Sequence, residues 1–188
     1  MMNKKIRMGM LAITLVFGTV FFSACASTAY TKLDGPEMPD AKTAVVYFVG
    51  RGSDCGVVWD GETPVGDFDE SGHSVMMWRT TPGTHYFIYK GFNYIVMRAE
   101  LDPNKRYYAH IMRIPNPIPF AKDLISARVL DPEEGERWLK STKIVSFTDK
   151  WREEYLEKEQ EELKEVQGYL KEAKGKALPV DMKKTDGR

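Results

Sequence analysis

The stretch from residue 43 to residue 130 is divided into short apolar runs by turn-forming residues, and this pattern restricts the fold more than any other feature of the chain. Closely spaced runs rich in β-branched and aromatic side chains are typical of a β-sandwich or a β-barrel. The runs span 43–49, 55–59, 62–68, 74–79, 84–90, 94–101, 106–114 and 124–130. The pattern predicts a mainly β domain, an antiparallel β-sandwich of about seven or eight strands.

Turn residues mark the places where these strands reverse. Asp60-Gly61 predicts a tight hairpin, because glycine adopts the positive φ that such turns need. Thr81-Pro82-Gly83 and Asp102-Pro103-Asn104 predict two further turns, since proline presets φ and glycine or asparagine tolerates the left-handed conformation. The proline-rich run 115–119 cannot donate to a sheet at its proline positions. It therefore predicts an extended crossing segment.

Helical signals come after residue 130. Asp131 followed by Pro132 and two acidic residues predicts a short helix that ends near Lys140. The run 143–147 predicts one more strand, which closes a domain over residues 43–147.

A long amphipathic helix is predicted over residues 148–175, with Thr148 as its N-cap. Its apolar residues form one narrow stripe, which includes Leu156, Leu163, Val166 and Leu170. We expect the start of the helix to dock on its own domain through Trp151 and Tyr155, and the far half to project. The polar residues 176–188 are predicted to be a disordered tail.

The N-terminus has the features of a secretory signal peptide over residues 1–24. Basic residues precede an apolar run from Leu11 to Phe22 that is too short to span a bilayer. This run ends in a sequence that resembles the bacterial lipobox, Phe22-Ser23-Ala24-Cys25. The resemblance implies that the Cys25 thiol takes a diacylglyceryl group and that Cys25 becomes the mature N-terminus.

The lipobox resemblance also implies a location. Ala26, rather than Asp, follows the cysteine, which in a diderm cell indicates transfer to the outer membrane, with the protein facing the periplasm. Residues 25–42 are small, polar and proline-containing, and we expect them to be a tether between lipid and domain. The alternative is an ordinary secreted protein that is cleaved near Ala26.

Three groups of residues resemble a bacterial lipoprotein domain family of unknown function. The groups are Val45–Val49, Trp59-Asp60-Gly61 with Val65-Gly66, and Pro82-Gly83-Thr84-His85 with Tyr107–His110. They resemble the domain of unknown function 2846, and the hairpin is similar to that of PEGA-type surface domains. The resemblance implies a small β-sandwich carried on a lipoprotein or secreted chain, and it supplies no catalytic residues.

No arrangement of residues in the sequence indicates catalysis, a metal or a cofactor. Cys55 has no second cysteine that could resolve a disulfide once Cys25 is lipidated. His73, His85 and His110 lie on different predicted strands, and His85 and His110 point to opposite sides of the sheet, so they do not converge as zinc ligands would. The equal numbers of basic and acidic side chains, 27 each, argue against a nucleic-acid binder.

We therefore expect a non-enzymatic, lipid-anchored accessory or interaction module of the cell envelope. Its partners would be the membrane, through Cys25, and an envelope protein held by the C-terminal helix. The alternative is a lipoprotein that binds a small molecule or a glycan against outward aromatic side chains. The candidate interaction residues are Tyr86, Tyr108, His110, Phe120, Leu163, Val166 and Leu170.

Overall fold

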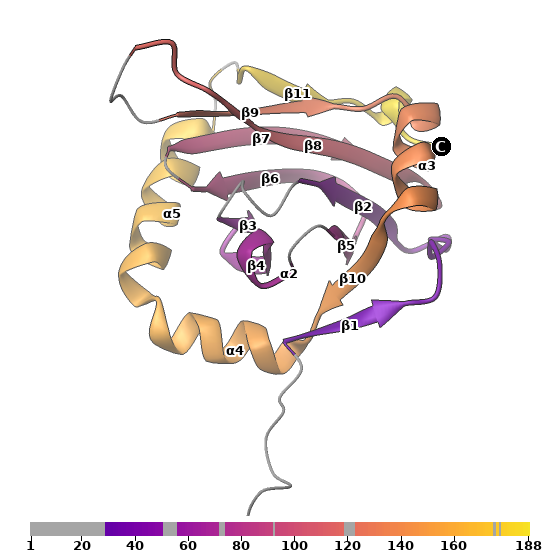
Figure 1. Cartoon of the computed structure of the whole chain (residues 1–188), viewed down its shortest axis with the longest axis horizontal. Helices are drawn as coiled ribbons and strands as arrows, with labels where there is room; N and C mark the ends of the chain where they lie inside the picture. Colours follow the sequence, from indigo (N-terminus) through magenta and orange to yellow (C-terminus); the bar gives the residue numbers. More distant parts are fainter. Residues whose placement is uncertain are drawn as a thin grey trace, which may run out of the picture.

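A computed structural model describes residues 29–50, 56–71, 74–91, 93–118, 123–174, 176 and 178–188. Two β-sheets lie face to face in it, and helices cover the outer face of each (Figure 1). Eleven strands fall in these ranges, so the predicted number of about seven or eight strands is wrong. The prediction of a mainly β protein is confirmed.

The first sheet has six strands in the order β1-β10-β5-β2-β8-β9. Their bounds are β1 Tyr30–Leu33, β10 Lys143–Phe147, β5 Ser74–Thr80, β2 Ala44–Val49, β8 Arg106–Ile114 and β9 Leu124–Val129. The second sheet has five strands in the order β11-β7-β6-β3-β4. Their bounds are β11 Val180–Met182, β7 Tyr94–Leu101, β6 Gly83–Lys90, β3 Val57–Asp60 and β4 Thr63–Asp67.

The sheets are mixed, so the prediction of a purely antiparallel sandwich is wrong. β2 and β8 pair in parallel, as do β5 with β10 and β7 with β11. Each of these pairs joins strands that are far apart in the chain, which leaves room for the crossover that a parallel pair needs. The hairpins between consecutive strands, such as β3–β4 and β6–β7, are antiparallel as predicted.

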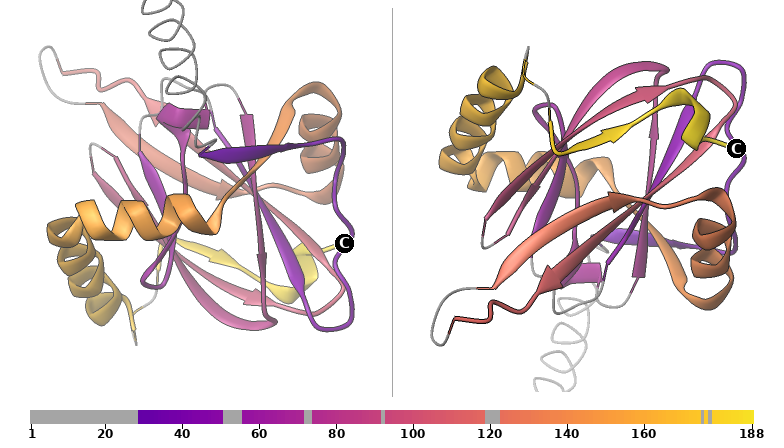
Figure 2. Two further views of the ribbon diagram at one scale, coloured as in Figure 1. Left: turned by 90° about the horizontal axis from the view of Figure 1, so that it is seen from below. Right: turned by 90° about the horizontal axis from the view of Figure 1, so that it is seen from above.

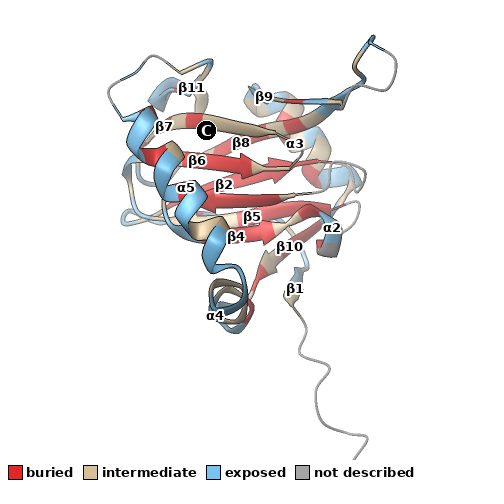
Figure 3. Ribbon diagram, turned by 90° about the vertical axis from the view of Figure 1, so that its left-hand side faces the viewer, coloured by how far each residue is buried: buried red, intermediate tan, exposed pale blue. Residues whose placement is uncertain are grey.

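The main core lies between the two sheets and continues on the outer face of the five-stranded sheet beneath α5. It holds the inward residues of both sheets, among them Phe48, Phe87, Tyr107 and Phe147. A second, smaller core lies on the outer face of the six-stranded sheet beneath α3 (Pro132–Ser141). Buried residues occupy the strands of both sheets, and most exposed residues lie on the helices and loops (Figure 3).

The C-terminal helical region bends at Glu159 into two helices. The first is α4 (Asp149–Lys158), which Thr148 caps as predicted, and the second is α5 (Gln160–Ala173). Glu159 has φ −106° and ψ 46°, which interrupts the single long helix that was predicted. The bend lets α5 turn along the outer face of the five-stranded sheet while α4 crosses its lower end (Figures 1 and 2).

Residues predicted as tether and tail both belong to the folded body. Tyr30–Leu33 of the tether form β1, which pairs antiparallel with β10. Val180–Met182 of the tail form β11, and Met182 is fully buried. Arg188 then exchanges two backbone hydrogen bonds with Arg106. These short strands gain their backbone partners only when the rest of each sheet is present, which is why the local sequence does not reveal them.

Two shorter elements complete the described fold, α2 (Phe68–Ser71) and the 3-10 helix η1 (Lys184–Asp186). No helix in the described part of the chain is both long enough and apolar enough to cross a membrane.

Candidate functional site

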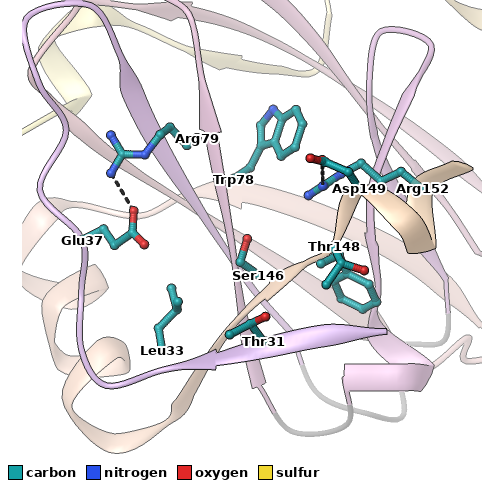
Figure 4. A pocket seen from close by; sticks show the side chains of 10 residues that line it. Thr31, Leu33, Glu37, Trp78, Arg79, Ser146, Thr148, Asp149 and Arg152 are labelled. Atoms are coloured by element: carbon teal, nitrogen blue, oxygen red, sulfur yellow. Dashed lines mark hydrogen bonds and ion pairs between the residues drawn. The ribbon is translucent and has the colours of Figure 1, made fainter. Parts of the chain in front are cut away.

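A polar groove lies next to the second core, at the ends of β5 and β10, and its lining residues come from both faces of the six-stranded sheet (Figure 4). Leu33 belongs to both, since it packs against that core and lines the groove. The groove has a volume of about 480 Å³. Its lining residues come from β1, the loop after β1, β5, β10 and the start of α4: Thr31, Leu33, Glu37, Trp78, Arg79, Ser146, Phe147, Thr148, Asp149 and Arg152.

Arg79 forms one side of the groove and holds the loop that follows β1. Its Nη2 donates to Glu37 Oε2 at 2.6 Å, and its Nη1 donates to Thr43 Oγ1 at 2.9 Å. The same loop is fixed on the sheet by Tyr47, whose hydroxyl accepts from Glu37 N at 2.9 Å. About a third of the Arg79 side chain stays exposed, at 35%. Arg79 therefore presents a positioned guanidinium to the groove.

Arg152 forms the opposite side of the groove. Its guanidinium carbon lies 4.7 Å from the centre of the Trp78 ring, a cation–π contact. Its Nη1 donates to Asp149 Oδ1 at 2.8 Å. The Arg152 side chain is only 11% exposed, whereas Asp149 is 95% exposed. Burial lowers the pKa of Arg152 below its ordinary value, and the nearby Asp149 charge opposes this shift.

The Nε of Arg152 is buried and has no hydrogen-bond partner within the described residues. Buried guanidinium donors are normally satisfied, because an unmet donor loses its hydration without compensation. Trp78 lies between the two arginines, and Thr31, Ser146 and Thr148 line the groove below them in the view of Figure 4. The groove is thus suited to bind a group with strong acceptor oxygens by charge-assisted hydrogen bonds.

Trp78 links the groove to a charged cluster around Asp60. The carboxylate of Asp60 accepts from Trp78 Nε1 at 2.8 Å and Thr80 Oγ1 at 3.2 Å, and lies 2.9 Å from His85 Nδ1. His85 Nε2 lies 2.8 Å from the Thr81 carbonyl oxygen. Both ring nitrogens of His85 therefore face acceptors, which only the doubly protonated ring satisfies. Burial works against this charge, but Asp60 and the Thr81 carbonyl outweigh it and raise the pKa of His85.

The predicted exposure of Tyr108 is wrong. Tyr108 is fully buried beneath α3, where its ring stacks on Tyr47 at 5.7 Å and its hydroxyl donates to Glu136 Oε1 at 2.6 Å. The alternation along β8 correctly places Tyr108 and His110 on the same face. That face is covered by α3, because His110 packs against Trp138 of the helix, with ring centres 5.4 Å apart.

Tyr86 lies half-buried on the outer face of the five-stranded sheet, where it packs against the main core. The structure therefore does not bring Tyr86 and Tyr108 together on one exposed surface. His85 and His110 belong to different sheets. Within the described residues, no group of three or more histidine, cysteine, aspartate and glutamate side chains could hold a metal ion.

The apolar stripe of the C-terminal helix is turned toward its own domain. Val166 is fully buried, Leu170 is 7% exposed, and the half-buried Leu163 packs against the same core. The prediction that Trp151 docks is confirmed, since Trp151 is buried and lies 4.5 Å from Phe147 between ring centres. The prediction that the far half of the helix projects is wrong, because the bend at Glu159 directs α5 onto the sheet.

Four of the predicted residues, Cys25, Cys55, His73 and Phe120, lie outside the described residues. The groove residues Arg79 and Arg152 were not among the predicted site residues. The sequence contained a partial signal for Arg152, which follows the Thr148 cap closely and must lie in the first turn of α4. Its position beside Trp78 depends on how α4 meets β5, and no local pattern encodes that.

Two further hollows lie elsewhere on the described surface. One of about 520 Å³ lies where the described chain begins, lined by Ala29, Tyr30, Trp151, Glu154, Tyr155, Lys158 and Glu159. The other, of about 240 Å³, lies beside α3 and is lined by Glu134, Arg137, Trp138 and Ser141.

Comparison with known proteins yields no match, whether with protein-family models, with curated proteins or with solved structures. The resemblance of residues 43–130 to the lipoprotein domain family therefore stays a prediction.

Proposed function

We propose that the protein is a lipid-anchored component of the cell envelope that acts as a non-enzymatic binding module. Its binding surface is the groove between Arg79 and Arg152, and its partner is an envelope protein that presents a carboxylate-bearing segment. The anchor is the diacylglyceryl group that the lipobox-like residues imply on Cys25.

One observation supports this proposal above the others. Two arginines face a common groove from opposite sides, and the buried Nε of Arg152 has no hydrogen-bond partner among the described residues. A carboxylate in the groove would accept charge-assisted hydrogen bonds from the exposed part of the Arg79 guanidinium, and arginine binds carboxylates in a fixed, often bidentate geometry. The adjacent hydroxyl groups of Thr31 and Ser146 would hold neighbouring polar atoms of the partner.

Two earlier interpretations lose their structural basis. The stripe of the C-terminal helix is packed on its own sheet, so it is not free to capture a partner. A glycan platform of outward aromatic residues needs Tyr108 at the surface, and Tyr108 is fully buried. The groove therefore takes the place of both as the proposed binding surface.

Photo-crosslinking in cells tests the groove. A photoreactive amino acid replaces the exposed Thr31 in the groove, and a control replaces the exposed Lys171 on the outer side of α5. We expect one discrete adduct from position 31 that disappears when Arg79→Ala is added, and no such adduct from position 171. An adduct that survives both Arg79→Ala and Arg152→Ala, or no adduct from position 31, contradicts the proposal.

The anchor is tested separately by feeding cells an alkyne-modified palmitate. We expect label on the wild-type chain, together with the mass of a diacylglyceryl-cysteine N-terminal peptide. The Cys25→Ser variant should carry no label and should be released from the membrane. An unmodified N-terminus near Ala26 contradicts the proposed anchor and supports an ordinary secreted protein.

A further inference from the structure

We infer that the anchored protein lies directly against the bilayer, with the hollow at Ala29, the start of β1 and α4 facing the lipid headgroups. This inference rests on the proposed lipidation of Cys25 and goes beyond it, because a lipid anchor alone does not set the orientation of a domain. The occupant of this surface is the membrane that holds the anchor.

The chain is attached to the folded domain where the described residues begin, at Ala29. The carbonyl oxygen of Ala29 accepts from Thr148 N at 3.1 Å and from Thr148 Oγ1 at 3.4 Å. The next residue, Tyr30, packs its ring 5.6 Å from that of Phe147, and its hydroxyl accepts from Lys143 Nζ at 3.2 Å. The chain is therefore held to the domain from Ala29 onward.

The connection between the lipidated cysteine and the folded domain is short. Only Ala26, Ser27 and Thr28 separate Cys25 from Ala29. Four Cα–Cα steps span at most about 14 Å when fully extended. The polar headgroup region on one side of a bilayer is about 5–8 Å thick. A domain of this size is about 40 Å across, so it cannot rotate freely on such a short connection.

The surface around Ala29 is partly aromatic. The hollow there is lined by Tyr30, Tyr155 and Trp151, of which Tyr30 and Tyr155 are half-buried and Trp151 is buried behind them in the core. Tyrosine and tryptophan are enriched at membrane–water interfaces, because their rings are apolar and their polar atoms stay hydrated. Lys143 Nζ lies 4.4 Å from the centre of the Tyr30 ring, so a cation accompanies the aromatic group.

The hollow carries no excess of positive charge. Lys158 lines it together with the acidic residues Glu154 and Glu159. Attraction to anionic lipids needs a basic excess, which this surface does not have. The short connection, rather than lipid charge, therefore enforces the contact, and the contact should be insensitive to salt and to anionic lipid.

The proposed groove lies beside the membrane-facing surface. Thr31 follows Tyr30 in β1, and Thr148 contacts Ala29, so the groove shares two elements with the membrane-facing surface. The groove would therefore meet its partner close to the membrane surface.

Depth-dependent fluorescence quenching tests the orientation. The full mature lipoprotein carries Cys55→Ser and one new labelled cysteine, either Lys158→Cys in α4 or Asp181→Cys in β11. Both positions are exposed, and the two elements lie at opposite ends of the molecule (Figure 1). The protein is reconstituted into phosphatidylcholine vesicles that contain a headgroup spin-labelled phosphatidylcholine as quencher. We expect several-fold stronger quenching at position 158 than at position 181, unchanged by added salt or by anionic lipid.

A matched variant with a longer segment between Cys25 and Ala29 tests whether the short connection sets the orientation. A flexible Gly/Ser insertion of about 20 residues after Ser27 gives an average reach of about 25 Å. We expect quenching at position 158 to fall to the level at position 181 in this variant. Equal quenching at the two positions in the lipidated protein with its native connection overturns the orientation. A purified chain without the diacylglyceryl mass overturns the proposed anchor instead, so the two failures are distinguishable.

Discussion

Lys90 and Glu162 form an ion pair of 2.8 Å between β6 and α5, and this contact ties the C-terminal helix to the outer face of the five-stranded sheet. Glu162 also accepts from Trp59 Nε1 at 3.1 Å and from Tyr155 Oη at 3.0 Å. Burial alone would lower the pKa of Lys90, but Glu162 and Glu165 outweigh it and raise that pKa. A carboxylate with three donors, 11% exposed, is part of the folded structure rather than of a solvated helix face.

We expect Glu162→Gln to lower the free energy of unfolding by roughly 1–2 kcal/mol, because the amide cannot satisfy all three donors and removes the charge opposite Lys90. Glu161→Gln is the matched control, since Glu161 is 86% exposed and should change stability by less than about 0.5 kcal/mol. Urea denaturation followed by circular dichroism measures both. Equal effects in the two variants would show that α5 is not anchored through Glu162.

Two helical glycines should respond in opposite ways to alanine. A Cβ on Gly135 in α3 would lie 2.2 Å from Cγ of the Tyr108 ring, whereas a Cβ on Gly168 in α5 would meet nothing within 4 Å. We expect Gly135→Ala to destabilise the protein by roughly 1–2 kcal/mol, because overpacking exceeds the gain in helix propensity. Gly168→Ala should stabilise it by about 0.5–1 kcal/mol. Thermal unfolding of both variants checks this, and stabilisation by Gly135→Ala would mean that α3 does not lie on Tyr108.

The His85–Asp60 pair should make stability depend on pH. The folded protein raises the pKa of His85 above its ordinary value of 6.5. A raised pKa contributes stability that is fully present below pH 6.5 and is lost as pH rises through the folded pKa. We expect the urea midpoint of the wild type to fall over this interval, and that of His85→Gln to fall less. If the two profiles are parallel between pH 5.5 and pH 8.5, His85 is not charged in the folded state.

The C-terminal residues should contribute measurably to the core. Met182 in β11 is fully buried, while the neighbouring Lys183 is exposed. We expect Met182→Ala to lower the free energy of unfolding by about 2–5 kcal/mol, as for other buried methionines that leave a cavity. Lys183→Ala should have little effect, since its backbone contact with Asp186 is kept. A Met182→Ala variant as stable as the wild type would restore the prediction of a disordered tail.

Most of the strands between residues 43 and 147 were predictable, because their signals are local. Alternating side chains and turn residues such as Pro82 and Asn104 act over a few positions, and Asn104 has the predicted positive φ of 60°. The helix start at Asp131 was equally local, since its side chain accepts from Glu134 N at 2.8 Å.

The candidate groove was not predictable, because its residues come from separate parts of the chain. Arg79 and Arg152 lie 73 positions apart, and they share the groove only because β1 and α4 meet β5 and β10. The Thr148 cap places Arg152 in the first turn of α4, but nothing near either arginine in sequence places the two on one surface.

The sequence by itself determined the mainly β class, the positions of most strands and the caps of the helices, since each depends on backbone preferences of neighbouring residues. Only the tertiary structure decided that the sheets are mixed, that Tyr108 is covered and that the helical stripe faces inward. Each of these depends on which distant segment fills a sheet edge or a sheet face. That choice is made by the burial of apolar surface over the whole domain, and no short window of sequence contains it.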